Sequence, residues 1–425
     1  MSAPRIVILG GGFAGAYCAQ ALEKAARRGR ARVLLIDRNN YFIFYPLLVE
    51  AGTGSLEPRH AVVPLRSFLK RTSFRMTEAV EVDFGRREIR CRAPGGAAET
   101  IPYDHLVLCP GSVTRLPNVP GLEQHAFEMK SLADAVALRD RAVGMLELAD
   151  AEPDPERRQA LLHFVVVGAN FTGVEVAGEL EVFLRHGRRL YHNVRREDCR
   201  ITLVEITDRI LPALDRKLAD YAASRLTRRR VRLLLHASVA RIDADKALLS
   251  GGESLAAHTV IWCAGIQPPP LVKRLHVPVD ARGYVLCERD MRVRGYENVW
   301  CIGDCAVIPD ASGRPYPPTA QHAVREGTRL ARNLARALVG KPTRPFDFSA
   351  LGSLAPLGCR TAVANVFGIN LSGFPAYVLW RSYYWLRMPG LARKIRVAMD
   401  WTADLLFTRD FVQLGLHRGR RHTAD

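Results

Sequence analysis

A strand, a glycine-rich turn, a helix and a second strand occur twice in this chain, and this repeat limits the possible folds more than any other feature. The first copy starts at Arg5 and reads RIVILGGGFAGAYCAQALEKAARRGRARVLLIDR. The second starts at Leu161 and reads LLHFVVVGANFTGVEVAGELEVFLRHG, followed by RITLVEITDRIL. Each pattern is typical of a βαβ nucleotide-binding unit. The sequence therefore predicts an α/β protein with two dinucleotide-binding domains.

The order of the later segments indicates that the second Rossmann-like domain is inserted in the first. After the second unit come NVWCIGDCAVIPD, a strand running into a turn, and the helix-like AQHAVREGTRLARNLARAL. We expect the chain to return to the first domain near Tyr284. The predicted ranges are 1–120 with 284–345 for the first dinucleotide-binding domain, 121–283 for the second, and 346–425 for a separate C-terminal segment.

Composition narrows the choice of partners and chemistry. Lys and Arg total 61 against 43 Asp and Glu, and the formal net charge of +18 favours anionic partners. We find no module that combines stacking aromatics with basic residues, so an anionic membrane surface is favoured over nucleic acid. The 9 cysteines show no metal-ligand spacing and no C-x-x-C pair. Cys301 and Cys305 are interpreted as small buried thiols, and no metal site is predicted.

The first glycine turn carries the complete pattern of a dinucleotide site. Gly10, Gly12 and Gly15 form G-x-G-x-x-G between a strand and a helix, where bare backbone lets a pyrophosphate reach the helix N-terminus. Asp37 closes the second strand, and its carboxylate can accept hydrogen bonds from both ribose hydroxyls of an adenosine. Strand, glycines, helix, strand and acid in this order predict a dinucleotide-binding site.

The second glycine turn departs from this pattern at one position. Gly168 and Gly173 are in place, but Asn170 stands where the close-approach glycine is expected. The Asn side chain would occupy pyrophosphate space, so we expect weaker or shifted nucleotide binding. Glu205 ends the next strand and would repel a 2′-phosphate, which favours NADH over NADPH. Arg209 nearby complicates that choice.

The last segment predicts contact with a membrane surface. Residues 376–388 are rich in aromatics, Pro389 and Gly390 interrupt them, and residues 395–407 place apolar side chains at helical spacing. No stretch approaches the ~20 apolar residues of a membrane span, and the chain enters its first strand with no room for a signal peptide. We therefore expect a peripheral protein on the cytoplasmic face of the cell membrane. The alternative is an ordinary helix pair packed on the core. The tryptophans and nearby basic residues that favour the membrane are Trp380, Trp385, Trp401, Arg381, Arg387, Arg393, Lys394 and Arg396.

The whole pattern resembles the type II NADH:quinone oxidoreductases, which are single-subunit flavoproteins that pump no protons. The resemblance rests on NYFIFYPLLVEAGTGSLEP, FTGVEVAGEL, LVEITDRILPALD, NVWCIGDCAVIPD and PPTAQHAVREG, and it covers nearly all of the chain. It implies electron transfer from NADH through FAD to a membrane quinone. It leaves a homodimer possible and does not identify the quinone.

The resemblance also implies roles for individual residues. Glu175 and Gln321 take the catalytic positions, with Glu175 near flavin and nicotinamide and Gln321 beside the flavin ring. The implied FAD-binding residues are Gly10, Gly12, Phe13, Ala14, Gly15, Asp37, Arg38, Pro46, Gly111, Asp304, Ala320 and Gln321. The implied NADH-binding residues are Gly168, Asn170, Gly173, Glu205 and Gly265. The implied quinone-binding residues are Tyr45, Pro46, Gln321 and Arg325.

Two departures from the family pattern keep other functions open. The family usually has a second Gln where this chain has Arg325, which adds charge beside an apolar ligand. Tyr45 stands where Gln is usual. A flavin reductase of the same architecture with a non-quinone acceptor, or a flavin redox sensor with little turnover, are the alternatives. Rapid bleaching of bound flavin by NADH would exclude the sensor.

Overall fold

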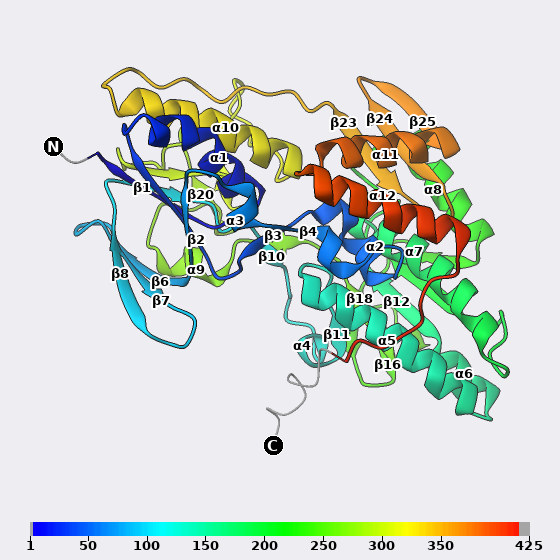
Figure 1. The fold of residues 1–425 in the computed structure, drawn as a ribbon. Helices are drawn as coiled ribbons and strands as arrows, with labels where there is room; N and C mark the ends of the chain where they lie inside the picture. The colour runs from blue at the N-terminus through cyan, green and yellow to red at the C-terminus, as the bar shows by residue number, and fades with distance from the viewer. Residues whose placement is uncertain (1–2, 416–425) are drawn as a thin grey trace. The chain divides into compact units, whose positions relative to one another are not determined.

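The computed structural model describes residues 3–415, and contacts divide them into two compact units (Figure 1). The first unit comprises residues 3–42, 63–113 and 266–350, and the second comprises residues 43–62, 114–265 and 351–415. Since the long central stretch of the second unit interrupts the first in sequence, the predicted insertion of one dinucleotide-binding fold in the other is confirmed.

The first unit is built on a five-stranded parallel sheet of strand order β21-β9-β1-β2-β5. Its strands are β1 (Arg5–Leu9), β2 (Arg32–Asp37), β5 (Ser73–Met76), β9 (His105–Leu108) and β21 (Val299–Cys301). Helices α1 (Phe13–Arg27) and α10 (Ala320–Ala337) pack against each other beside this sheet. Gly327 permits that approach, because a Cβ there would overlap the carbonyl oxygen of Ala14. The unit's remaining elements are α3 (Leu65–Phe68), α9 (Pro270–Arg274), β20 (Val285–Leu286), β22 (Ala306–Val307) and the antiparallel strands β6 (Glu78–Asp83), β7 (Glu88–Arg92) and β8 (Ala98–Pro102).

The second unit repeats this plan with a parallel sheet of strand order β11-β18-β12-β13-β14. Its strands are β11 (Ala126–Phe127), β12 (His163–Val167), β13 (Arg200–Val204), β14 (Val231–Leu234) and β18 (Thr259–Trp262). It also has its own antiparallel sheet, as the first unit does. That sheet contains β15 (Val239–Ile242), β16 (Lys246–Leu249) and β17 (Ser254–Ala256). The internal repeat therefore extends over two whole domains, beyond the βαβ units evident in the sequence.

Helices complete the core of the second unit. Helices α5 (Leu132–Ala151), α7 (Phe171–Gly187) and α8 (Arg216–Arg228) have buried faces that share one cluster with the strands. A capping box starts α5, because the Ser131 hydroxyl accepts from the backbone of Asp134 and the Asp134 carboxylate accepts from that of Ser131. The shorter helices are η1 (Tyr45–Leu47), α2 (Leu48–Gly52), η2 (Pro58–Ala61), α4 (Leu122–His125), α6 (Pro155–Leu161) and η3 (Arg188–Leu190). Short strands at the points where the chain changes unit are β3 (Tyr41–Ile43), β4 (Val62–Pro64), β10 (Val113–Thr114) and β19 (Ile266–Gln267).

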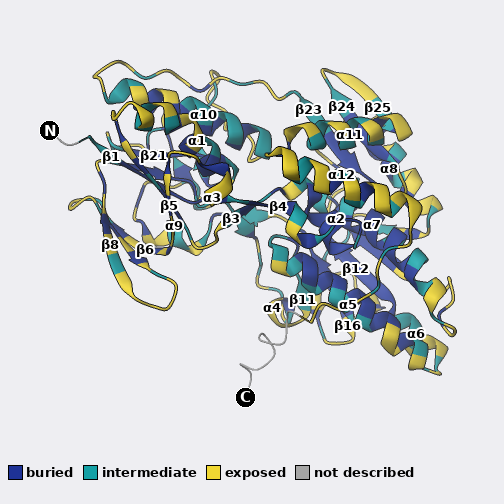
Figure 2. Cartoon of the chain, viewed as in Figure 1, coloured by how far each residue is buried: buried dark blue, intermediate teal, exposed yellow. Residues whose placement is uncertain are grey.

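The C-terminal part of the second unit contains a sheet that the sequence did not reveal. Strands β23 (Gly352–Pro356), β24 (Ala362–Val366) and β25 (Ile369–Gly373) form an antiparallel meander. Helix α11 (Phe374–Arg387) packs on this meander and is followed by α12 (Leu391–Leu406). Figure 2 shows exposed residues along much of α12. Among the residues described, no helix is both long enough and apolar enough to cross a membrane.

The compact units divide the chain differently from the predicted ranges. Residues 43–62 group with the second unit because α2 packs against α5 and α7. Residues 266–283, expected in the NADH-binding domain, group with the first unit. Residues 351–415 are part of the second unit, because the C-terminal meander packs on α7 and α8. The C-terminal segment is thus helical only after Gly373.

Candidate functional site

The first glycine loop leaves open space where a ligand could approach the start of α1. Cβ atoms at Gly10 and Gly15 would overlap backbone oxygens of Cys109 and Gly10, so packing requires both glycines. Gly10 also has a φ of +110°, which other residues rarely adopt. A Cβ at Gly12 would meet no atom within 4 Å. The glycine at position 12 is therefore required by nothing in the protein itself, which fits close approach of a pyrophosphate.

Asp37 braces this loop from the end of β2. Its carboxylate oxygens accept hydrogen bonds from the backbone N–H of Gly11, at 2.6 Å, and of Asn39, at 2.7 Å. Burial raises the pKa of Asp37, and these two hydrogen bonds oppose that rise. The carboxylate thus lies directly beside the glycine loop, as required of a residue that contacts a ribose. Phe13 and Ala14 are the first residues of α1, and Arg38 follows Asp37.

Two further predicted FAD residues of the first unit, Gly111 and Asp304, follow strands β9 and β21. Gly111, with φ +71°, follows β9, and the neighbouring Ser112 hydroxyl donates to the Asp304 carboxylate at 2.7 Å. Gly303 precedes Asp304, and its N–H donates to the buried Glu326 carboxylate at 2.7 Å. Burial raises the pKa of Glu326 to about 7, and Asp304 adds to the rise. The structure thereby links the CIGDC turn to α10.

Ala320 and Gln321 form the first turn of α10, whose N-cap is Thr319. The Arg325 guanidinium donates to the Gln321 carbonyl at 2.9 Å and lies over the Phe348 ring, 4.2 Å from its centroid. A cation held on an aromatic face is partly shielded from its surroundings. The charge that Arg325 adds beside the predicted quinone residues is thus held on Phe348.

The second glycine loop copies the backbone of the first and adds a side chain. Gly168 has φ +96°, and a Cβ at Gly173 would overlap the Gly168 carbonyl oxygen. Asn170 has extended backbone with φ −72° and ψ −173°. Its amide oxygen accepts from the Gly173 N–H at 3.1 Å, and its amide nitrogen donates to the Cys263 carbonyl at 2.7 Å. Asn170 is therefore an N-cap that occupies one N–H at the start of α7.

Glu205 follows β13 and holds the second glycine loop through hydrogen bonds, as Asp37 holds the first. Its carboxylate accepts from the N–H of Ala169 at 2.6 Å and of Thr207 at 2.9 Å. Gly265, with φ +82°, follows β18 as Gly111 follows β9. The predicted NADH residues of the second unit are thus gathered at the carboxyl ends of β12, β13 and β18, where such sheets bind ligands. The Arg209 guanidinium, considered as a phosphate partner, donates to the Pro212 carbonyl at 3.1 Å.

The predicted quinone residues are divided between the two units. Tyr45 and Pro46 belong to the short helix η1 of the second unit, whereas Gln321 and Arg325 belong to α10 of the first. The Tyr45 ring is 40% exposed, and the Lys130 ammonium lies 5.1 Å from its centroid. Tyr45 is therefore an accessible aromatic residue with a cation on its face.

Glu175 lies in a cluster of carboxylates that the sequence did not reveal. Glu175 and Glu179 are one turn apart on α7, and Glu50 comes from α2, which packs on α7. Burial raises the pKa of Glu175 well above its usual value, and the charges of Glu50 and Glu179 raise it further. Burial also raises the pKa of Glu50, to about 7. Glu175 and Glu50 therefore hold protons at a pH where surface carboxylates are ionised.

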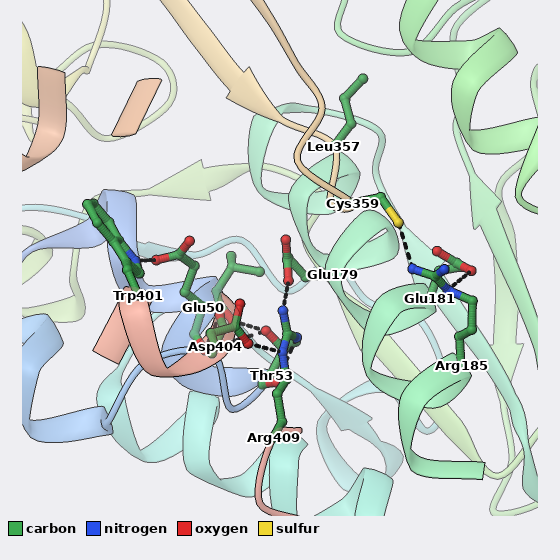
Figure 3. Close-up of polar contacts among 12 residues, drawn as sticks. Glu50, Thr53, Glu179, Glu181, Arg185, Leu357, Cys359, Trp401, Asp404 and Arg409 are labelled. Carbon is green, nitrogen blue, oxygen red and sulfur yellow. Dashed lines mark hydrogen bonds and ion pairs between the residues drawn. The ribbon is translucent and has the colours of Figure 1, made fainter. Parts of the chain in front are cut away.

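C-terminal residues supply the partners of this cluster (Figure 3). Trp401 of α12 donates its indole N–H to Glu50 at 2.8 Å, and the Arg381 guanidinium lies 3.8 Å from the same carboxylate. Arg409 pairs with Glu179 at 3.2 Å and with Asp404 at 2.8 Å. The only sequence signal of this carboxylate cluster was that two apolar runs, PLLVEAG and VAGEL, each contain one acidic residue. Trp401, Arg381 and Arg409 were not recognisable as partners because they lie over 200 residues away in the sequence.

The cysteines of the CIGDC turn are buried thiols. The sulfur atoms of Cys301 and Cys305 lie 3.5 Å apart, and both residues are free cysteines. Burial raises the pKa of Cys301 well above its usual value, which disfavours a reactive thiolate. Within residues 3–415, no three acidic, His or Cys side chains converge as a metal site would require.

Comparison with known families and proteins agrees with this geometry. Residues 4–327 match the pyridine nucleotide-disulphide oxidoreductase family, and residues 351–410 match the NDH2 C-terminal domain. A probable NADH dehydrogenase of Dictyostelium discoideum is 31% identical over 96% of this chain and 90% of its own length. The type II NADH:quinone oxidoreductase Ndh of Mycobacterium tuberculosis is 29% identical over 95% of this chain and 89% of its own.

A solved structure shows the same fold. NDH2 from Plasmodium falciparum, in a complex with NADH, superposes with a TM-score of 0.89 at 20% identity. The match covers 96% of this chain and 99% of that one. At this identity the likeness concerns the fold, which includes the C-terminal meander and helices.

Proposed function

The chain belongs to the type II NADH dehydrogenases of the pyridine nucleotide-disulphide oxidoreductase family, and we propose from this premise how its residues divide the reaction. It is an FAD-dependent oxidoreductase that transfers electrons from NADH to a quinone and pumps no protons. The observation that carries this function is that both family matches together span two complete dinucleotide folds and the NDH2 C-terminal domain.

The first glycine loop is the proposed FAD site. The space above Gly12, the two N–H groups held by Asp37 and the nearby Asp304 fit a dinucleotide whose pyrophosphate lies at the start of α1. When bound there, FAD supplies the redox chemistry between hydride donor and quinone. The protein's part is to bind, orient and exclude water.

The second loop is the proposed NADH site, with Glu205 selecting against a 2′-phosphate. Overall, NADH, one proton and the quinone give NAD⁺ and the quinol, so the reaction consumes a proton. We assign the supply of this proton to Glu175. Its raised pKa and half-buried position in the carboxylate cluster support the role, since a protonated carboxyl can donate.

The proposed quinone residues are Tyr45, Pro46, Gln321 and Arg325. Tyr45 offers an exposed aromatic face, and Arg325 is held by Phe348 and by the Gln321 carbonyl. Gln321, in the first turn of α10, is assigned the second catalytic role and would contact the flavin when FAD is bound. A substitution of Arg325 by Gln should change the KM for quinone while leaving the KM for NADH unaltered.

Membrane contact is assigned to an apolar ridge on the two C-terminal helices. Trp380 and Trp401 cannot contribute, because they are 1% and 7% exposed, and Arg381 is paired with Glu50. This corrects the expectation that these residues face lipid. The exposed large apolar side chains that define the ridge are Leu386, Leu391, Ile395, Met399, Leu406 and Phe407. We place this ridge in the interface of an anionic membrane at the cytoplasmic face, with Arg387 and Arg396 exposed beside it.

The catalytic proposal is tested by steady-state assays on the purified, FAD-loaded protein. NADH oxidation should depend on added quinone and should fall strongly when Glu175 is replaced by Gln. The difference from the parent should shrink as pH rises through the pKa of Glu175, because the parent then lacks the same proton. A Glu253→Gln variant is the control, since Glu253 is a half-exposed carboxylate of the same unit that pairs with Arg232. Quinone-independent oxidation of NADH would favour a reductase with another acceptor.

The membrane proposal is tested by sedimentation with anionic vesicles. Replacing Leu391, Ile395 and Met399 together by serine should abolish pelleting. Each of these apolar side chains would contribute about 1.5–3 kcal/mol to membrane binding when it is buried in the bilayer interface. A control variant carries serine at Leu148, Leu190 and Val339, which are also exposed apolar residues. Equal pelleting of the two variants would contradict the assignment of the ridge.

A further inference from the structure

A recess on the second unit is lined by five arginines and has no function in the reaction described above. It is open to solvent and lies at the end of α7, beside the first residues of β13 and β14. Its apolar side chains belong to Leu184, Cys199, Ile201 and Val231. Its charged side chains belong to Glu181, Arg185, Arg188, Arg196, Arg229 and Arg230.

The single carboxylate of the recess cannot balance this charge. Glu181 lies 3.2 Å from the Arg185 guanidinium and 3.6 Å from that of Arg229. No ion pair within residues 3–415 involves the other three arginines, Arg188, Arg196 or Arg230. Like charges gathered in one concave site attract an anion.

Water can satisfy only some of the arginines that have no ion pair. Arg196 and Arg230 are exposed and can face water. The Nε of Arg188, however, is buried and has no hydrogen-bond partner among the described residues. The C-terminal dipole of α7 favours nearby cations, but its charge of roughly half an electron offsets one arginine at most. The recess therefore has an excess of cationic donors that the protein does not satisfy.

Two of the arginines are held in place by the turn between β23 and β24. Arg229 donates to the Leu357 carbonyl. A guanidinium nitrogen of Arg185 lies 2.6 Å from the Cys359 sulfur (Figure 3). Such anchoring reduces the entropy lost when a ligand binds. The recess also contains the first residues of its strands, whereas Glu205 follows the last residue of β13. The recess therefore lies at the amino ends of the strands, whereas the proposed NADH site lies at their carboxyl ends.

We propose that this recess binds a phosphate group of a soluble or lipid ligand, separately from both dinucleotide sites. Planar guanidinium groups match the oxygens of a phosphate and bind it through paired hydrogen bonds. The apolar side chains of the recess then contact the uncharged part of the same ligand. Because the arginines of the recess attract the phosphate electrostatically, the affinity for the ligand falls as ionic strength rises.

The first test is calorimetric titration of the full chain with pyrophosphate at low ionic strength. FAD is loaded and NAD⁺ is saturating, so that both dinucleotide sites are occupied. We expect one saturable site whose affinity falls at least tenfold when Arg188→Gln and Arg196→Glu are combined. Arg196→Glu alone, at an exposed position, should weaken binding at least threefold without affecting folding. Arg216→Glu, an exposed charge reversal at the start of α8, is the matched control and should leave the affinity unchanged.

The second test uses vesicles that contain phosphatidic acid, with the apolar ridge substituted by serine in every protein. Saturable binding of pyrophosphate alone identifies a soluble phosphate ligand, and binding of vesicles alone identifies a lipid headgroup. In either case the double arginine variant must lose the binding. The proposal is overturned if neither probe binds saturably, or if the double variant and the Arg216→Glu control bind equally well.

Discussion

The two glycine loops of this protein have nearly the same backbone and differ in one side chain. Gly12 has φ −68° and ψ −167°, and Asn170 has φ −72° and ψ −173°. In both loops a carboxylate at the end of the second strand accepts two backbone N–H groups. At the first loop the space above the glycine is open, whereas at the second an amide caps the helix.

This difference suits two dinucleotides with different residence times. An open loop leaves every N–H at the start of α1 available to a pyrophosphate, which favours a cofactor that stays bound. A loop whose side chain already uses the Gly173 N–H offers one donor fewer, which favours a substrate that must leave after each turnover. We interpret the first loop as the holder of FAD and the second as the exchange site for NADH. The predictions below for Gly12, Glu205 and Asn170 test this division.

The largest effect is expected from closing the first loop. Gly12→Val places a side chain where no protein atom lies within 4 Å, so the protein should fold while its flavin content falls below about a tenth of normal. Flavin absorbance per chain after gel filtration measures this. Gly251→Val is the control, because a Cβ at Gly251 also meets open space, in the turn between β16 and β17. A Gly12→Val protein that retains its full flavin content would show that FAD does not bind at this loop.

The buried glutamates of the two units should make stability depend on pH. The pKa values of Glu50 and Glu326 are raised to about 7, so the folded state binds protons more tightly than the unfolded state. Stability is therefore greatest below about pH 4.5 for these groups and is lost as pH rises through about 7, by up to about 3 kcal/mol each. Denaturant unfolding of Glu50→Gln and Glu326→Gln should show a smaller loss over this range than the parent. An unchanged pH dependence in both variants would contradict the raised pKa values.

A smaller effect, about 1.4 kcal/mol, is expected at the carboxylate of the second loop. Glu205→Gln removes the charge that repels a 2′-phosphate, so the ratio of kcat/KM for NADH to that for NADPH should fall about tenfold. Glu253→Gln changes a charge elsewhere in the same unit and should leave the ratio as it is. An unchanged ratio in the Glu205→Gln variant would mean that another residue recognises the ribose.

The smallest effect is expected from making the second loop like the first. Asn170→Gly frees the Gly173 N–H, and the KM for NADH should fall about threefold, while the lost cap costs only a few tenths of a kcal/mol. The reciprocal Gly12→Asn should weaken FAD retention. If the KM for NADH stays the same or rises, the amide of Asn170 does not compete with the phosphate.

Sequence reasoning predicted the α/β class, the two inserted folds and the element carrying each glycine loop, because local patterns define all of these. It did not predict that Asn170 caps α7, since a side chain's choice between two hydrogen-bond partners depends on the Cys263 carbonyl over 90 residues away. It also missed the meander of β23–β25 and assigned Trp380, Trp401 and Arg381 to lipid. Aromatic and basic residues in amphipathic helices look alike whether they face a bilayer or a buried carboxylate such as Glu50.

The division of the two loops is tested most directly by the two half-reactions measured separately without oxygen. The FAD-loaded protein is mixed with NADH while the yellow absorbance is followed, and the reduced protein is then mixed with quinone. We predict that bleaching is at least as fast as turnover, that quinone restores the colour, and that Asn170→Gly accelerates bleaching at low NADH without altering recovery. Bleaching slower than turnover, or an equal effect of Asn170→Gly on both half-reactions, would contradict the account.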